Sequence, residues 1–126
     1  MYLFPKNIEI QKISIDHFLP WSFVGHDCLW NLLPTFSQVN SSKSDKLPDL
    51  SVYLDSFLKI QFEAFHLNMG FNKPKLLEDY SLLFSKELAE IKNLSQVDFC
   101  NLLKDNILPM HQIAKNMGFA PNWIYK

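Results

Sequence analysis

The feature that most constrains the fold is a change of pattern at Pro48. Before it, the chain is rich in aromatic residues, Pro, Ser and Asn, and shows no helical period. After it, apolar residues recur every three or four positions, as amphipathic helices require. We therefore predict an α+β fold in which residues 1–48 form a small strand-containing unit. Because a unit of that size buries little area alone, residues 49–126 should pack on it as a helical extension within one structural domain.

Two short strands are predicted in the first unit. Residues 6–15 alternate polar and apolar side chains, with one slip that indicates a bulge or two short strands ending near Asp16. Residues 18–29 show no period and are predicted to form a loop. Residues 30–33 are apolar except for Asn31, and Pro34 ends the run, which predicts the second strand.

Helices are predicted from Ser37 onwards. Ser37 can cap a short helix that runs to about Asp45. The rest of the chain predicts three or four helices, with Ser95 as the cap of the last and Pro109 kinking or splitting it. The three apolar stripes span residues 50–65, 76–91 and 97–107. Trp123 belongs to an irregular tail and is expected to dock on the core.

Charge and cysteine content exclude several classes of protein. The formal net charge is −1 and all twelve basic residues are Lys. This excludes a strongly basic protein that covers DNA without sequence specificity, so any contact with nucleic acid must be local. Cys28 and Cys100 form no Cys-x-x-Cys pair, which argues against a structural zinc finger and for reduced thiols. We find no targeting signal and no long apolar run, so we expect a cytoplasmic protein without membrane contact.

The polar residues best suited to chemistry lie between the first strand and the short helix. Asp16 and His17 end the first strand, Asn31 lies on the second, and Asn40 and Lys43 lie one turn apart on the helix. A carboxylate is a hard ligand for a divalent cation, and an imidazole is a base near neutral pH. Neighbouring strand residues point to opposite faces, so Asp16 and His17 can serve one site only if the chain leaves the strand at His17. Each residue alone could equally be an ordinary turn or helix-end residue.

Three blocks of sequence carry a family resemblance when they are taken together. They are IDHFLP at residues 15–20, WNLL at residues 30–33 and NSSKSDKLP at residues 40–48. In order and spacing they resemble the HNH, or ββα-metal, endonuclease family. The amino-acid sequence of these blocks is similar to that of stand-alone bacterial HNH endonucleases and of the HNH domain of RNA-guided CRISPR nucleases. The resemblance covers about residues 8–48.

This resemblance implies a metal-dependent endonuclease that hydrolyses DNA phosphodiester bonds on a ββα-metal unit. It implies that His17 is the general base and that Asp16 and Asn40 hold one divalent ion. Oxygen ligands favour Mg²⁺, with Mn²⁺ substituting and Zn²⁺ less suited to the site. The resemblance also implies that Asn31 holds the loop between the strands and orients the base, and that Lys43 lies near a phosphate.

Two further hypotheses stay open. Only 15 residues precede Asp16, and the first 48 residues carry four Lys against four acidic side chains, so DNA affinity should be low. The chain could be a catalytically weak or inactive HNH-derived protein that binds a protein partner through its helices. It could also be a nuclease subunit that is active only with a companion.

Two other polar residues are expected to have structural roles. We expect Asp27 to brace its loop rather than bind metal, and His111 to be a surface or hydrogen-bonded residue.

Overall fold

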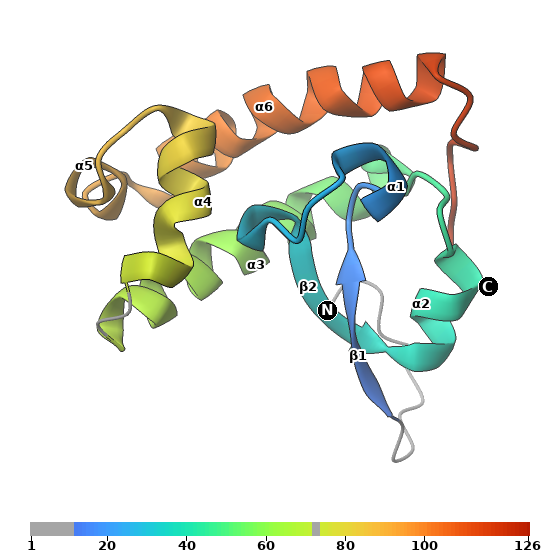
Figure 1. The fold of residues 1–126 in the computed structure, drawn as a ribbon, viewed down its shortest axis with the longest axis horizontal. Helices are drawn as coiled ribbons and strands as arrows, with labels where there is room; N and C mark the ends of the chain where they lie inside the picture. The colour runs from blue at the N-terminus through green and yellow to red at the C-terminus, as the bar shows by residue number, and fades with distance from the viewer. Residues whose placement is uncertain (1–11, 72–73) are drawn as a thin grey trace.

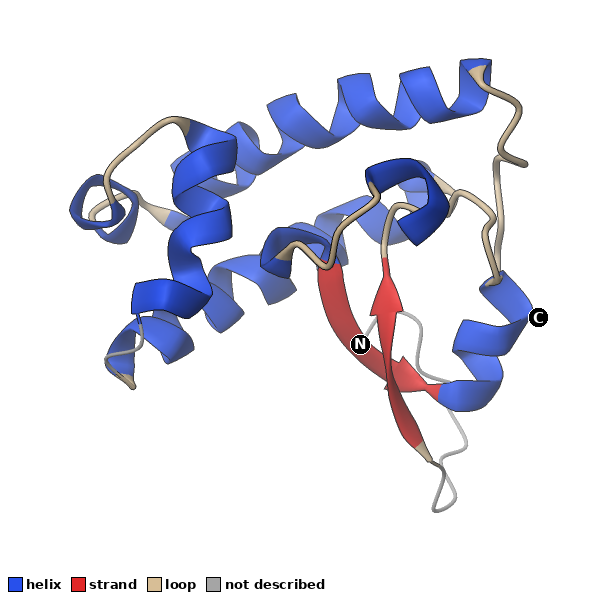
Figure 2. Cartoon of the chain, in the orientation of Figure 1, coloured by secondary structure: helices blue, strands red, loops and turns tan. Residues whose placement is uncertain are grey.

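The computed structural model describes residues 12–71 and 74–126. The predicted α+β class is confirmed, because a two-stranded antiparallel sheet is followed by several helices (Figure 1; Figure 2). The elements in chain order are β1 (Ile13–His17), α1 (Trp21–Val24), the 3-10 turn η1 (Leu29–Asn31), β2 (Leu32–Phe36), α2 (Ser37–Lys43), α3 (Leu50–Gly70), α4 (Pro74–Phe84), α5 (Leu88–Lys92) and α6 (Gln96–Asn116). In Figure 1 the sheet and α2 lie on one side, α4 and α5 lie on the other, and α3 and α6 connect the two sides.

The sheet differs from the prediction in its second strand. β1 runs to His17, which pairs with Leu32, whereas the slip predicted between Ile10 and Ile13 begins outside the described residues. Residues 30–31 belong to η1 rather than to the strand, and Pro34 lies inside β2 opposite Ile15 instead of closing it. Both strands of a two-stranded sheet are edges, so a residue without an N–H group is tolerated where its nitrogen faces away from the partner.

The loop that was expected between the strands contains two helical turns. Pro20 precedes α1, and Gly25 ends it in the left-handed conformation at φ 80°. η1 follows three residues later and leads directly into β2. The first residue of α2 is Ser37, and Phe36 occupies the cap position without a side-chain bond, so the predicted cap at Ser37 is wrong.

The helical extension departs from the prediction at two places. The single stripe predicted over residues 76–91 is divided into α4 and α5, because Ser85 adopts φ 53° and Ser81 closes the end of α4 through bonds with Lys86. Pro109 does not split the last helix, since α6 continues through it. The predicted cap at Ser95 is confirmed, because its hydroxyl accepts a hydrogen bond from Asp98 N at 3.1 Å.

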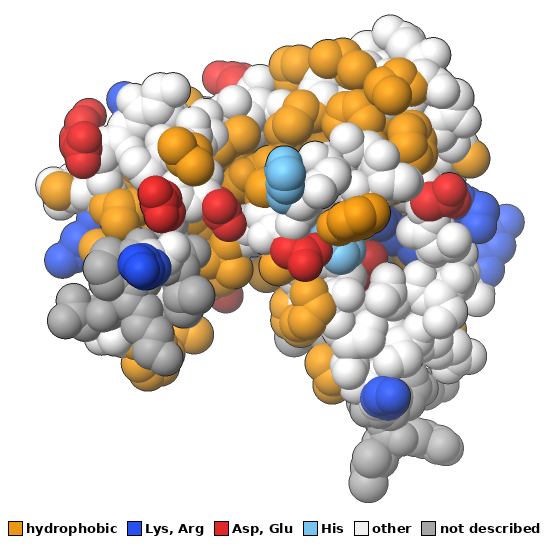
Figure 3. Space-filling view, in the orientation of Figure 1, with side chains coloured by type: hydrophobic (Ala, Val, Ile, Leu, Met, Phe, Trp, Pro, Cys, Tyr) orange, Lys and Arg blue, Asp and Glu red, His pale blue; other side chains and the backbone are white. Residues whose placement is uncertain are grey.

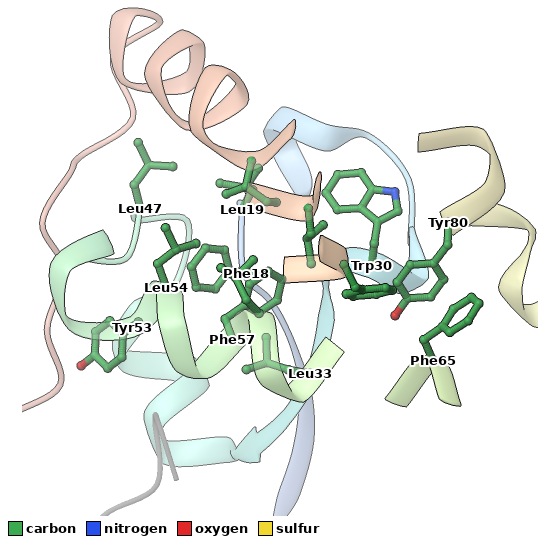
Figure 4. Close-up of a cluster of buried hydrophobic side chains, with 14 of the residues drawn as sticks. Phe18, Leu19, Trp30, Leu33, Leu47, Tyr53, Leu54, Phe57, Phe65 and Tyr80 are labelled. Carbon is green, nitrogen blue, oxygen red and sulfur yellow. The ribbon is translucent and has the colours of Figure 1, made fainter. Parts of the chain in front are cut away.

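One cluster of buried apolar side chains spans the strand unit and the helices (Figure 4). The ring of Phe18, directly after β1, stacks on Phe57 of α3 with 3.9 Å between the ring centroids. Trp123 N donates a backbone hydrogen bond to Leu47 O at 2.9 Å, and the Trp123 side chain is buried, as predicted for the tail. The segment that carries the candidate site is therefore packed directly against the helical extension.

Candidate active site

Helix α2 lies against the face of β1 that carries Asp16. Ser14 and Asp16 share this face because side chains two positions apart in a strand point the same way. The amide nitrogen of Asn40 donates to Ser14 Oγ at 2.8 Å and lies 3.5 Å from the carbonyl oxygen of Ile15. Lys43, one helical turn later, reaches the same strand. The order strand–turn–strand–helix thus brings together Asp16, Asn40 and Lys43.

Asp16 and Lys43 form a buried ion pair. Lys43 Nζ lies 3.5 Å from Asp16 Oδ1 and donates a hydrogen bond to the carbonyl oxygen of His17. Their exposed fractions are 2% and 0%. Burial raises the pKa of the Asp16 carboxyl, although the Lys43 ammonium opposes the shift. Burial likewise lowers the pKa of Lys43 against the opposing effect of Asp16, so each partner stabilises the charge of the other at a site that disfavours charge.

The second carboxylate oxygen of Asp16 is a buried acceptor without a partner. Oδ2 is shielded from solvent and accepts no hydrogen bond from the described residues. Buried polar atoms without partners are rare, and such an atom can bind an ordered water molecule, an ion or a ligand. The bonds of Asn40 to β1 use its amide nitrogen, and an amide oxygen is itself a hard donor. One carboxylate oxygen and one amide oxygen are a donor set that fits Mg²⁺ or Mn²⁺ completed by water.

The imidazole of His17 lies on the other side of β1 and is held by Asp27. His17 Nε2 is 2.7 Å from Asp27 Oδ1, and the His17 side chain keeps 27% of its surface exposed. His17 is the last residue of β1, so the chain leaves the strand directly after it. Asp16 therefore faces α2 while His17 faces the loop that follows α1.

Asn31 fixes the chain immediately after His17. Its side chain accepts a hydrogen bond from Leu19 N and donates one to Leu19 O, both at 2.8 Å. Its backbone carbonyl accepts a hydrogen bond from Phe18 N at 2.9 Å. The side chain of Asn31 is completely buried. Asn31 thus contacts the backbone of the loop between the strands.

Side chains of the helical extension also hold the strand unit in place. Asp79 of α4 accepts a hydrogen bond from Leu29 N at 2.8 Å, which anchors the residue that begins η1. Gln61 of α3 donates to Leu32 O at 2.7 Å and accepts a hydrogen bond from the hydroxyl of Tyr80. The two contacts with the strand unit span 29 and 50 positions of sequence, so no local pattern indicates them.

Among the predicted site residues, Lys43 differs most from its predicted role near a phosphate. Its ammonium is bonded inside the protein, and contact with a phosphate would require it to leave His17 O and Asp16. Sequence reasoning missed the contact of Asp27 with His17. The only sequence signal for it is an acidic residue in the loop between the two strands.

Within residues 12–71 and 74–126, no three His, Cys, Asp or Glu side chains are arranged to hold a metal ion. None of the helices in these ranges combines the length and the apolar character needed to cross a membrane.

Residues 4–49 match the family model described as HNH endonuclease, and the matched segment includes all five predicted site residues. No curated protein and no solved structure matches the chain. The family match indicates a nuclease.

Proposed function

We propose, from the membership of residues 4–49 in the HNH endonuclease family, that the protein is a metal-dependent endonuclease that hydrolyses DNA phosphodiester bonds. The observation that carries the proposal is the unpartnered, buried oxygen of Asp16 on the strand face against which Asn40 packs. His17 follows Asp16 directly and ends the same strand. A carboxylate ligand and a base therefore occupy neighbouring positions at the end of β1, with Asn40 of α2 packed on the Asp16 side of the strand.

His17 acts as the general base in this proposal. Phosphodiester hydrolysis needs a water molecule that loses a proton as it attacks phosphorus. The partly exposed imidazole of His17 is available to solvent and can accept that proton. A positioned general base contributes a rate factor of about 10² to 10⁴.

Asp16 and Asn40 would hold one divalent ion through oxygen atoms. When bound, such an ion supplies Lewis-acid stabilisation of the phosphate charge. The carboxylate–amide donor set favours Mg²⁺, with Mn²⁺ as a substitute and Zn²⁺ less favoured in the absence of thiolate or several imidazoles. The positive charge of an ion also favours the ionised form of Asp16, which burial otherwise disfavours.

Asn31 and Lys43 keep the two adjacent residues in place. Asn31 bonds the backbone that leaves β1 after His17. Lys43 donates to the carbonyl oxygen of His17 and neutralises part of the charge of Asp16. Both act from inside the protein, because both side chains are completely buried.

DNA is the proposed substrate, and its binding should be weak and dependent on salt. The formal net charge is −1, and Figure 3 shows basic side chains at several separate places on the viewed face rather than in one patch. Affinity for the phosphate backbone increases with the number of phosphates neutralised. A companion protein that binds the helical extension would supply the missing affinity.

The free thiols of Cys28 and Cys100 fit a reducing compartment such as the cytoplasm.

One observation favours a second candidate, a non-catalytic HNH-derived binding protein. The Lys43 ammonium lies 3.5 Å from Asp16 Oδ1 and already compensates the carboxylate that would bind the ion. A chain that has replaced the ion by an internal cation would keep the fold and lose cleavage. The two candidates differ in whether a divalent ion binds at Asp16.

Nicking of a supercoiled plasmid tests the proposal. The purified protein is assayed with Mg²⁺, with Mn²⁺ and with EDTA, beside His17→Ala, Asn40→Ala and the control His26→Ala, which removes an exposed neighbouring imidazole. We expect nicking that needs the divalent ion and falls at least about 100-fold in His17→Ala. Equal activity of His17→Ala and wild type rejects His17 as the base. Absence of nicking in every sample favours the binding protein.

A further inference from the structure

The contact between Asp27 and His17 links the loop after α1 to the end of β1. Asp27 Oδ1 lies 2.7 Å from His17 Nε2, which is hydrogen-bond distance. An ionised carboxylate can only accept a hydrogen bond, so Nε2 carries the proton. In a neutral imidazole the other ring nitrogen, Nδ1, then holds the free lone pair.

The backbone on both sides of His17 is fixed by other contacts. Lys43 Nζ donates to His17 O, and Phe18 N donates to Asn31 O at 2.9 Å. These bonds leave the two side-chain torsions of His17 free. Asp27 is the residue whose hydrogen bond restrains them.

Asp27 is itself held in position by the residues around it. Gly25, two residues before Asp27, ends α1 at φ 80°, and its N–H donates to Trp21 O. Leu29 N, two residues beyond Asp27, is anchored by Asp79 Oδ2 at 2.8 Å. The loop therefore presents its carboxylate from a backbone that is fixed on both sides.

We infer that Asp27 is a positioning residue for the His17 imidazole: its carboxylate accepts the Nε2 proton and directs Nδ1 toward the attacking water. This inference rests on the proposed function for its catalytic consequence. The hydrogen bond itself does not depend on that function. Asp27 touches neither substrate nor ion in this role and acts through His17.

Because Asp27 is exposed, its effect on the position of His17 can be measured without a loss of protein stability. Its side chain is 71% exposed, and hydrogen-bonded pairs at such a surface contribute little to the stability of the fold. Asp27→Ala should therefore fold as the wild type does. Outer carboxylates that orient metal-bound histidines contribute about 10- to 100-fold to activity, and we expect a loss of the same order here.

The test combines a spectroscopic and a kinetic measurement on the full chain. Three-bond NMR couplings about the Cα–Cβ bond of His17 report whether its side chain occupies one rotamer. They are measured without added metal for wild type, Asp27→Ala, Asp27→Glu and Asp45→Ala. Asp45 is a matched control, because it is an exposed aspartate of the same unit and its removal changes the net charge equally. The kcat and KM for plasmid nicking are measured for the same four proteins.

We expect a single His17 rotamer in the wild type and in Asp45→Ala, and averaging among rotamers in Asp27→Ala. In the kinetic measurement, Asp27→Ala should lose about 10- to 100-fold in kcat without a rise in KM. Asp27→Glu, which restores a carboxylate, should regain most of that loss. Asp45→Ala should keep the wild-type kcat.

Two results would overturn the inference. The first is an unchanged His17 rotamer in Asp27→Ala, and the second is an unchanged kcat of this variant while the wild type is active. Failure of the proposed function looks different. In that case the wild type does not nick DNA with any divalent ion, and the NMR couplings still show whether Asp27 positions the His17 side chain.

Discussion

Asn31 pairs with both backbone polar groups of Leu19. Its Oδ1 accepts from Leu19 N and its Nδ2 donates to Leu19 O, each at 2.8 Å. Both residues are completely buried, so no solvent can replace either bond. One side chain thus satisfies a turn whose backbone would otherwise be unpaired inside the core. The turn also carries the chain away from His17.

Asn31→Ala should strongly destabilise the protein. It leaves two buried backbone groups unpaired at about 1–3 kcal/mol each, so the free energy of unfolding should fall by about 2–6 kcal/mol. Urea unfolding followed by circular dichroism measures the change. Asn106→Ala is the control, because it removes one bond to Leu102 O within α6, and it should cost below about 1 kcal/mol. Equal losses in the two variants would contradict the role of Asn31.

Lys43→Met should destabilise the fold through Asp16. The substitution removes one partner of a buried ion pair and leaves an uncompensated carboxylate, which typically costs about 3–5 kcal/mol. The double variant Asp16→Asn with Lys43→Met removes both charges and should recover part of that loss. Chemical denaturation of the four proteins of this cycle gives the coupling energy. A coupling of zero would show that the pair contributes nothing.

Removal of the divalent ion should lower thermal stability, and by less when Asn40 is absent. A ligand that binds the folded state alone raises stability by about 2.7 kcal/mol at a free concentration 100 times its Kd. Mn²⁺ should therefore raise the Tm of the wild type, EDTA should reverse the effect, and Asn40→Ala should weaken it. Differential scanning calorimetry with and without Mn²⁺ measures this. Asn68→Ala, a helix-surface control, should respond to Mn²⁺ as the wild type does.

His111 should make the fold less stable in mild acid. Burial lowers the pKa of His111 in the folded protein, although its contact with Pro48 O opposes the shift. The unfolded chain then binds more protons, so this contribution to stability is complete above a pH of about 6.5 and is lost as the pH falls toward the folded pKa.

The variant His111→Gln should remove this loss while keeping a donor for Pro48 O. The quantity to compare is the free energy of unfolding in urea at a pH of about 7.5 and of about 5. Wild type should lose more than His111→Gln between the two conditions, and the exposed control His26→Gln should behave as the wild type does. Identical losses in wild type and His111→Gln would refute the prediction.

Tyr80→Phe should weaken the attachment of the helical extension to β2. The Tyr80 hydroxyl donates to Gln61 Oε1, and Gln61 in turn donates to Leu32 O at 2.7 Å. Removal of the hydroxyl leaves a buried acceptor unpaired, at a cost of about 1–3 kcal/mol. Equilibrium unfolding measures the loss, with Tyr125→Phe as a control whose hydroxyl belongs to the tail. An unchanged stability of Tyr80→Phe would show that water or another donor replaces the bond.

The sequence alone determined the class of the fold and the order of its parts. The change of pattern at Pro48 separates the strand unit from the helices, because alternation and helical spacing are local properties of neighbouring residues. The cap at Ser95 and the docking of Trp123 were predicted correctly. The blocks around Asp16, Asn31 and Asn40 led to the HNH family, which the match over residues 4–49 supports.

Only the tertiary structure decided where the side chains of the candidate site lie. The placement of Pro34 inside β2 and the break at Ser85 depend on edge geometry and on one left-handed residue, which local patterns do not indicate. The burial of Lys43 against Asp16 and the hydrogen bond between Asp27 and His17 join positions that are distant in the chain. Such contacts depend on how the elements pack, so a pattern confined to neighbouring residues contains no information about them.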